Sequence, residues 1–222
     1  MSETRGNASE QPLRIGALVS GGGRTVLNIA EHIRTHALSA VISVVISSRK
    51  NAPAIERCRA VNLDVEVVQR SGQSQRAFDK QIGEILKSRG CDLVCMCGFY
   101  SLWTIPPEFA GRVVNIHPAL LPSYGGKGFY GDHVHRAVLQ AGEKASGCTV
   151  HYADNEYDHG PILLQESVAV AETDNVDTLA SKVFETECIA YPQAIAMLTD
   201  GRAPLPHPDL AAMAHSNPAR TD

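Results

Sequence analysis

The first half of the chain alternates short apolar runs with amphipathic stretches. The apolar runs have the length and β-branched content of buried strands, and they lie at 14–20, 41–47, 64–68, 92–97 and 113–117. Apolar positions at helical spacing separate these runs and predict helices at about 24–34, 52–61 and 74–88. Strands that alternate with helices of this length are typical of parallel βαβ units.

The second half adds two strands and a long final helix, predicted at 148–153, 162–170 and about 175–198. We therefore predict a single α/β domain over 14–202, with a mostly parallel, twisted sheet of about seven strands and helices on both faces. Residues 1–13 are polar and are predicted to form a disordered tail. The Pro- and Ala-rich residues 203–222 are predicted to form a loose C-terminal tail.

Composition narrows the class of protein. The chain has 222 residues, of which 44% are hydrophobic and 20% charged, and this suits one domain with a sizeable core. The formal net charge of −4 shows no basic excess, so we expect no nucleic-acid partner. The sequence has no apolar run of about 18 residues. It also has no signal-peptide core near its N-terminus, and we expect a cytoplasmic protein with no membrane partner.

Six cysteines raise the question of a metal or disulfide site. Cys91, Cys95 and Cys97 lie within one apolar run, and their spacing matches no common zinc pattern. We interpret the cysteines as reduced residues of the core.

The strand at 113–117 ends in a polar pair. Asn115 and His117 are two residues apart, so a strand places both side chains on one face and Ile116 on the other. Pro118 has no N–H for a ladder, and the strand must end near His117. Ligands of open parallel sheets bind at the edge where the strands end. The alternative is a hydrogen-bonded amide and imidazole in a tight turn.

A glycine turn follows the first predicted strand. Gly21, Gly22 and Gly23 precede a helix, and this combination predicts an anion site made of backbone N–H groups at a helix N-terminus. The dinucleotide fingerprint fails because Val26 occupies its third glycine position, and the P-loop spacing is absent. A single phosphate monoester fits better, and the alternative is a tight turn without a ligand.

Two carboxylates are further candidates. Asp158 lies in a turn-rich segment between two predicted strands, and beside an imidazole it would orient the ring and favour its protonated form. Glu187 falls on the apolar stripe of the final helix, where a carboxylate needs a partner. That partner is either a salt bridge or the hydroxyl groups of a ligand.

The segment Ser123–His135 contains four glycines directly after the Asn115–His117 pair. We predict a mobile loop, well placed to act as a lid. His133 and His135 raise the possibility of a metal held with His117. No acidic ligand is fixed by the spacing, so we predict no metal site.

With these residues placed, the chain resembles the phosphoribosylglycinamide formyltransferases, the folate-dependent transferases of purine biosynthesis and one-carbon metabolism. The resemblance runs from about residue 14 to residue 202. It rests on the motifs SGGGRT (20–25), CGFYSLW (97–103), NIHPALLP (115–122), GCTVHY (147–152), DHGPILLQ (158–165) and ETECIAYP (185–192). It implies the Rossmann-like fold of that family.

The resemblance also assigns roles. The catalytic residues would be Asn115, His117 and Asp158. The ribonucleotide phosphate and ribose would be bound by Gly21, Gly22, Gly23, Arg24, Thr25, Arg76 and Glu187. The folate pocket would be formed by Phe99, Tyr100, Ser101, Leu102, Trp103, Asn155, Glu156 and Tyr157. The chain departs from the family at a few positions. Arg24 and Thr25 stand where Ser-Asn is frequent, Ser101 where some members have arginine, and Ala119 where serine is common.

The function implied is transfer of a formyl group from 10-formyltetrahydrofolate to the amine of glycinamide ribonucleotide, without a metal. Small-molecule substrates and a monomer or homodimer are expected. One alternative is a formyltetrahydrofolate hydrolase or a formyltransferase for another amine. These branches commonly carry an extra N-terminal regulatory or C-terminal RNA-binding domain, which we do not expect here. A second alternative is a non-catalytic nucleotide-binding module, and the presence of all three catalytic residues argues against it.

Overall fold

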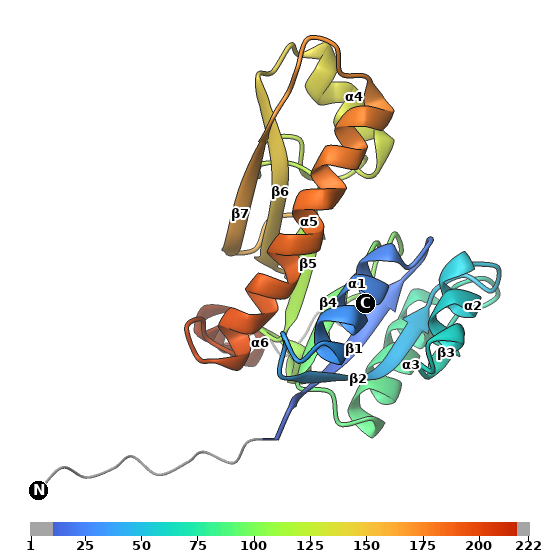
Figure 1. The fold of residues 1–222 in the computed structure, drawn as a ribbon. Helices are drawn as coiled ribbons and strands as arrows, with labels where there is room; N and C mark the ends of the chain where they lie inside the picture. Colours follow the sequence, from blue (N-terminus) through green and yellow to red (C-terminus); the bar gives the residue numbers. More distant parts are fainter. Residues whose placement is uncertain (1–10, 217–222) are drawn as a thin grey trace, which may run out of the picture.

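The computed structural model describes residues 11–216, in which seven strands form one sheet (Figure 1). The strands are β1 (Leu13–Val19), β2 (Ala40–Ser47), β3 (Val65–Val67), β4 (Leu93–Met96), β5 (Val113–His117), β6 (Ala145–Tyr152) and β7 (Ile162–Ala169). Their order across the sheet is β3-β2-β1-β4-β5-β6-β7. The predicted α/β class with a seven-stranded, mostly parallel sheet is confirmed.

The sheet changes direction at β5. The pairs from β3 across to β5 are parallel, whereas β5–β6 and β6–β7 are antiparallel. β5 therefore has a parallel neighbour on one side and an antiparallel neighbour on the other. Open α/β sheets bind ligands outside the carboxyl ends of their parallel strands, and the Asn115–His117 pair lies at that end of β5.

Helices cover both faces of the sheet, as predicted. They are α1 (Arg24–Arg34), α2 (Pro53–Ala60), α3 (Gln75–Ser88), α4 (Asp132–Gln140), α5 (Val176–Thr199) and α6 (Pro208–Ser216), with a short 3₁₀ turn, η1 (Pro107–Phe109). Alternation along β1 separates two core layers: Ile15 and Val19 pack in the layer of α1 and α5, and Leu18 packs in the layer of α3. In Figure 1, α5 runs along β6 and β7.

The predicted loose tail, 203–222, is wrong for the part that the structure describes. Ala203 is buried, and the hydroxyl of Tyr152 donates a hydrogen bond to the carbonyl of Pro204 at 2.6 Å. α6 follows, and the ring of His207 contacts that of Tyr152 at 4.7 Å between centroids. The segment therefore packs against the core of the domain. Its composition alone did not predict this packing. Residues 217–222 and 1–10 of the two predicted tails lie outside the described residues.

The glycine-rich segment Ser123–His135 also differs from the prediction of a loop, because α4 begins within it at Asp132. Val134 and Val138 point into the core from this helix, and their burial stabilises it despite the glycines before it. In the described range, 11–216, there is no helix of the length and apolar character that crossing a membrane requires.

Candidate active site

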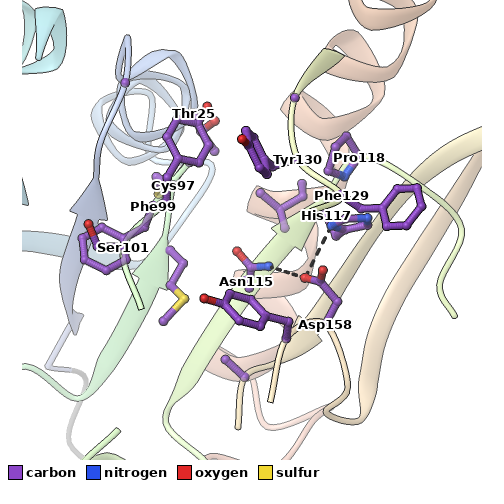
Figure 2. Close-up of a pocket in the computed structure, with 18 of the residues that line it drawn as sticks. Thr25, Cys97, Phe99, Ser101, Asn115, His117, Pro118, Phe129, Tyr130 and Asp158 are labelled. Carbon is purple, nitrogen blue, oxygen red and sulfur yellow. Dashed lines mark hydrogen bonds and ion pairs between the residues drawn. The ribbon is translucent and has the colours of Figure 1, made fainter. Parts of the chain in front are cut away.

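A cavity of about 570 Å³ opens at the carboxyl ends of β1, β4 and β5. In Figure 2, Thr25, Phe99 and Ser101 lie along one wall, and Asn115, His117 and Asp158 lie along the other. Tyr130 reaches between them from the glycine-rich segment, and its ring is 5.8 Å from that of Tyr100. The cavity thus joins segments that are far apart in the sequence.

The chain after β5 is fixed by a network of hydrogen bonds to β6 and β7. The hydroxyl of Thr149 donates to the carbonyl of Ala119 at 2.7 Å and accepts from the N–H of Leu121 at 3.1 Å. The amide of Gln165 donates to Thr149 Oγ1 at 2.8 Å and to the Leu121 carbonyl at 3.0 Å. Because these backbone groups are held, the strand tip that carries His117 is fixed in position.

Asn115, His117 and Asp158 meet in this cavity. The Nδ2 of Asn115 donates to Oδ1 of Asp158 at 3.4 Å, and Nδ1 of His117 lies 3.4 Å from the same oxygen (Figure 2). Both donors therefore converge on one point. Asp158 has a left-handed backbone, with φ of 53°. The turn that carries it closes tightly on β6 because Gly160 has no side chain: a Cβ there would lie 1.9 Å from the carbonyl oxygen of Tyr152.

Both ring nitrogens of His117 face acceptors. Its Nε2 lies 2.8 Å from the carbonyl oxygen of Tyr124, which only accepts, so Nε2 carries a proton. Its Nδ1 faces the carboxylate of Asp158, which would accept a hydrogen bond from a proton on that nitrogen. Burial raises the pKa of Asp158. Hydrogen bonds from His117 and from the backbone N–H of Gly126, together with the charge of His117, outweigh this and hold the pKa of Asp158 well below its ordinary value.

His151 is a site residue that the sequence reasoning missed. Its Nδ1 donates to the carbonyl of Tyr152 at 2.9 Å, so Nε2 presents a lone pair and accepts from Nδ2 of Asn115 at 3.1 Å. This contact fixes which end of the Asn115 amide faces Asp158. The register that opposes Asn115 to His151 across β5 and β6 supplies the contact, and no local sequence signal specifies that register.

The glycine turn forms the other end of the cavity. Gly21 to Gly23 line it, and Gly23 precedes α1 with a left-handed φ of 74° and no side-chain cap, so the first N–H groups of the helix are available to a ligand. A Cβ at Gly23 would lie 2.8 Å from that of Ala54. Ser20, directly before the turn, forms a hydroxyl–hydroxyl hydrogen bond of 2.6 Å with Ser48.

Arg24 and Glu187 line the cavity between these two ends. The guanidinium of Arg24 is stacked 3.9 Å from the ring centroid of Phe184 on α5. Burial raises the pKa of Glu187 to about 7, although the charges of Arg24 and His117 lower it. Among residues 11–216, no hydrogen bond or ion pair satisfies the Glu187 carboxylate. The arrangement therefore favours ligand hydroxyls over a structural salt bridge as its partner.

Arg76 is not brought to the cavity. It is exposed in the first turn of α3 and is not among the residues that line the cavity. Arg49 lines the cavity instead, with its guanidinium 5.7 Å from the ring centroid of Tyr100. Arg49 is therefore a residue of the cavity that the sequence analysis did not identify.

The two segments assigned to a folate pocket both line the cavity. These residues are Phe99, Tyr100, Ser101, Leu102, Trp103, Asn155, Glu156 and Tyr157. Tyr100, Leu102 and Tyr157 are exposed and offer apolar surface to a ligand. Trp103 is 2% exposed, and its indole N–H donates to the carbonyl of Asp79 at 3.2 Å. The Asn155 side chain accepts the N–H of Ile105 at 2.8 Å. These last two residues shape the pocket more than they present polar groups to it.

The histidines considered for a metal site do not come together. His133 is exposed on α4 and does not line the cavity, whereas His117 and His135 do. In the part of the chain that the structure describes, no three His, Cys, Asp or Glu side chains are grouped to hold a metal ion. All six cysteines are free thiols, and Cys95 and Cys97 are buried in the core.

Comparison with known proteins identifies the family. The family model for formyl transferase matches residues 13–195. The chain belongs to the formyl transferase family. Membership confirms the resemblance predicted from the motifs and implies a folate-derived formyl donor with small-molecule substrates.

Three similar proteins are named for formyl transfer or purine biosynthesis. The chain is 31% identical to the phosphoribosylglycinamide formyltransferase of Escherichia coli, over 86% of this chain and 89% of that protein. It is 33% identical to the trifunctional purine biosynthetic protein adenosine-3 of Drosophila melanogaster over 91% of this chain, but it spans only 15% of that protein's length. The solved structure of glycinamide ribonucleotide transformylase 1 from Symbiobacterium toebii is 35% identical, with a TM-score of 0.83, covering 90% of this chain and 94% of that one.

Proposed function

We propose that this chain is a phosphoribosylglycinamide formyltransferase, which transfers the formyl group of 10-formyltetrahydrofolate to the amine of glycinamide ribonucleotide. The observation that carries the proposal is the meeting of Asn115, His117 and Asp158 in one cavity with a phosphate-type glycine turn and exposed apolar side chains. A transferase needs both substrates to reach one reacting centre, and this cavity offers an end for each.

The glycine turn suits the phosphate of the ribonucleotide. The uncapped N–H groups at the start of α1 and the cations Arg24 and Arg49 line that end, so an anion finds hydrogen bonds and positive charge together. Glu187, next along the wall, is placed to accept hydrogen bonds from ribose hydroxyls. The exposed ring of Tyr157, beside Asp158 in the sequence, suits the flat ring system of a folate, whereas the ring of Tyr100 lies beside the glycine turn.

The reacting centre stabilises charge on oxygen. When the amine attacks the formyl carbon, the formyl oxygen becomes an oxyanion in a tetrahedral intermediate. Asn115 and the His117 imidazolium are donors that already converge on one point, and their 3.4 Å contacts to Asp158 are long enough for an incoming oxygen to compete for them. Removing one such donor costs roughly 3–4 kcal/mol of transition-state stabilisation in enzymes with an oxyanion hole.

Asp158 has two roles in this proposal: it stabilises the positive charge of His117, and it relays the proton that moves from the amine to the folate. Its carboxylate stays ionised and keeps His117 protonated, so the oxyanion meets a cation. The amine must lose a proton as the new C–N bond forms, and N10 of the folate must gain one as its bond to the formyl carbon breaks. Asp158 lies beside the reacting centre and is placed to relay that proton, directly or through water. No covalent enzyme intermediate is required.

The proposal is tested by following absorbance of a 10-formyl folate with and without glycinamide ribonucleotide. We expect loss of the formyl group that depends on the ribonucleotide and yields the formylated ribonucleotide by mass. Equal loss without the ribonucleotide would identify a hydrolase instead. Binding of both substrates without turnover would identify a non-catalytic module.

A further inference from the structure

Three histidines line the cavity, and one of them, His135, has a ring nitrogen without a hydrogen-bond partner among the described residues. His117 and His151 each engage both ring nitrogens with groups of the protein. His135 does not: its Nδ1 is buried and has no hydrogen-bond partner among the residues that the structure describes. Buried polar atoms are rarely left unpaired, so this nitrogen calls for a partner that the chain does not supply.

The position of His135 ties it to the reacting centre. It lies in the first turn of α4, which packs on α5, and its side chain is 4% exposed while it lines the same cavity as His117. The two rings are close enough for the charge of His117 to act on His135. His133, two residues earlier on the same helix, is exposed and lies outside the cavity wall.

The surroundings keep the His135 ring neutral. Burial has the largest effect and lowers the pKa of His135; the charge of Asp132 on its own helix opposes it by raising the pKa, and the charge of His117, the smallest effect, lowers it. The two histidines therefore differ: both ring nitrogens of His117 face acceptors of the protein, whereas His135 is a neutral ring that still has a lone pair. A neutral acceptor does not compete with His117 for the oxyanion.

We propose that His135 is a further substrate-contacting residue, whose neutral ring accepts a hydrogen bond from the amine that attacks the formyl carbon. The inference rests on the proposed formyl transfer, because that reaction brings an amine beside the group that holds the formyl oxygen. A hydrogen bond from one N–H of the amine leaves its lone pair free to point at the carbon. Held in this way, the nucleophile approaches with less loss of orientational freedom.

A direct test observes the histidine nitrogens of the unmodified protein. Protein labelled with ¹⁵N in its histidine rings is titrated with glycinamide ribonucleotide, without folate, and the ring nitrogen shifts are followed by NMR. The His135 signals are assigned by their absence from His135→Phe. We expect the Nδ1 signal to move on addition of the ribonucleotide. Saturation with the ribonucleotide and no movement of the His135 signals would overturn the proposal.

Variants add a functional readout. His135→Phe keeps the size of the ring without its nitrogens, and we expect kcat/KM for the ribonucleotide to fall by about 10- to 100-fold with an unchanged Kd for the folate. His135→Asn places an amide near the position of Nδ1 and should recover part of this loss. The matched control, His133→Phe, should behave as wild type. A His135→Phe enzyme within about twofold of wild type would make His135 a residue of the core only.

The two proposals fail in different ways. If the wild-type protein does not transfer formyl groups to glycinamide ribonucleotide, the proposed function fails. If the wild type transfers them and His135→Phe does so equally well, only the role of His135 fails. Should His135→Phe not fold, His135→Asn replaces it, both to assign the His135 signals of the wild-type titration and to compare kcat/KM.

Discussion

Replacement of Glu187 by glutamine should stabilise the fold and weaken substrate binding at the same time. The carboxylate lies in the cavity wall, partly buried and without a protein partner, and this burial raises its pKa from 4.5 to about 7. The folded protein therefore holds a proton on Glu187 at pH values where the unfolded chain has lost it. Stability contributed by this group is full below pH 4.5 and declines as pH rises through 7.

The size of the effect follows from the shift in pKa. Each tenfold change in protonation equilibrium is worth about 1.4 kcal/mol, so a rise from 4.5 to about 7 amounts to roughly 3 kcal/mol lost well above pH 7. Glu187→Gln removes the ionisation and should recover most of that. For a domain of this size the expected rise in Tm is about 5–10 °C at pH 8.5 and near zero at pH 4.5.

Thermal unfolding across pH 4.5 to 8.5 measures this difference, and Glu185→Gln is the matched control because Glu185 is exposed on the same helix. Glu187→Gln should raise the Tm but lower the affinity for the ribonucleotide. Because a neutral amide replaces a charged acceptor, we expect binding about 10-fold weaker. A Tm that is equal to wild type at pH 8.5, or lower, would refute the reasoning from burial. Unchanged affinity would remove Glu187 from the substrate site.

Three further predictions address the rest of the site. Asp158→Asn keeps the volume but removes the charge that holds His117 protonated, so turnover should fall by about 100-fold or more and the remaining activity should shift to lower pH. Adding Asp158→Asn to His117→Ala should cost little more than His117→Ala alone, and fully additive losses would separate the two residues. Gly23→Val places a Cβ against Ala54 in a left-handed backbone, so KM for the ribonucleotide should rise while folate affinity holds; unaltered ribonucleotide binding by a folded variant would reject the phosphate site. Turnover should survive exhaustive chelation, because residues 11–216 contain no grouped set of metal ligands, and activity lost to a chelator and restored by a divalent ion would contradict this.

The parts of the fold that local patterns determine were predictable from the sequence. β5 was predicted with its observed ends because two β-branched residues start it and Pro118 stops it. The glycine turn and α1 follow from three glycines and a helical stripe. Asn115 and His117 share a face for the simple reason that a strand has a period of two.

The parts that depend on contacts between distant segments were not predictable. The pairing of His151 with Asn115 depends on the register of β5 against β6, and the choice of Arg49 over Arg76 depends on where α3 lies relative to the cavity. α4 was not predicted, because the glycines before it are typical of a loop. Its stability comes from burial of Val134 and Val138 in the core. α6 was not predicted either, because the Pro- and Ala-rich composition of its segment is typical of loose tails.

The missing side chain of Gly160 has a consequence for judging distant relatives. A methyl group at this position would collide with the backbone of β6 and push away the turn that carries Asp158. A homologue with alanine there would keep every reacting group and still misplace one of them. An alignment that counts only Asn115, His117 and Asp158, the residues proposed to act in catalysis, would then overstate the number of working enzymes. For inferring activity across a family tree, position 160 is therefore as informative as position 158, although it contributes no chemical group.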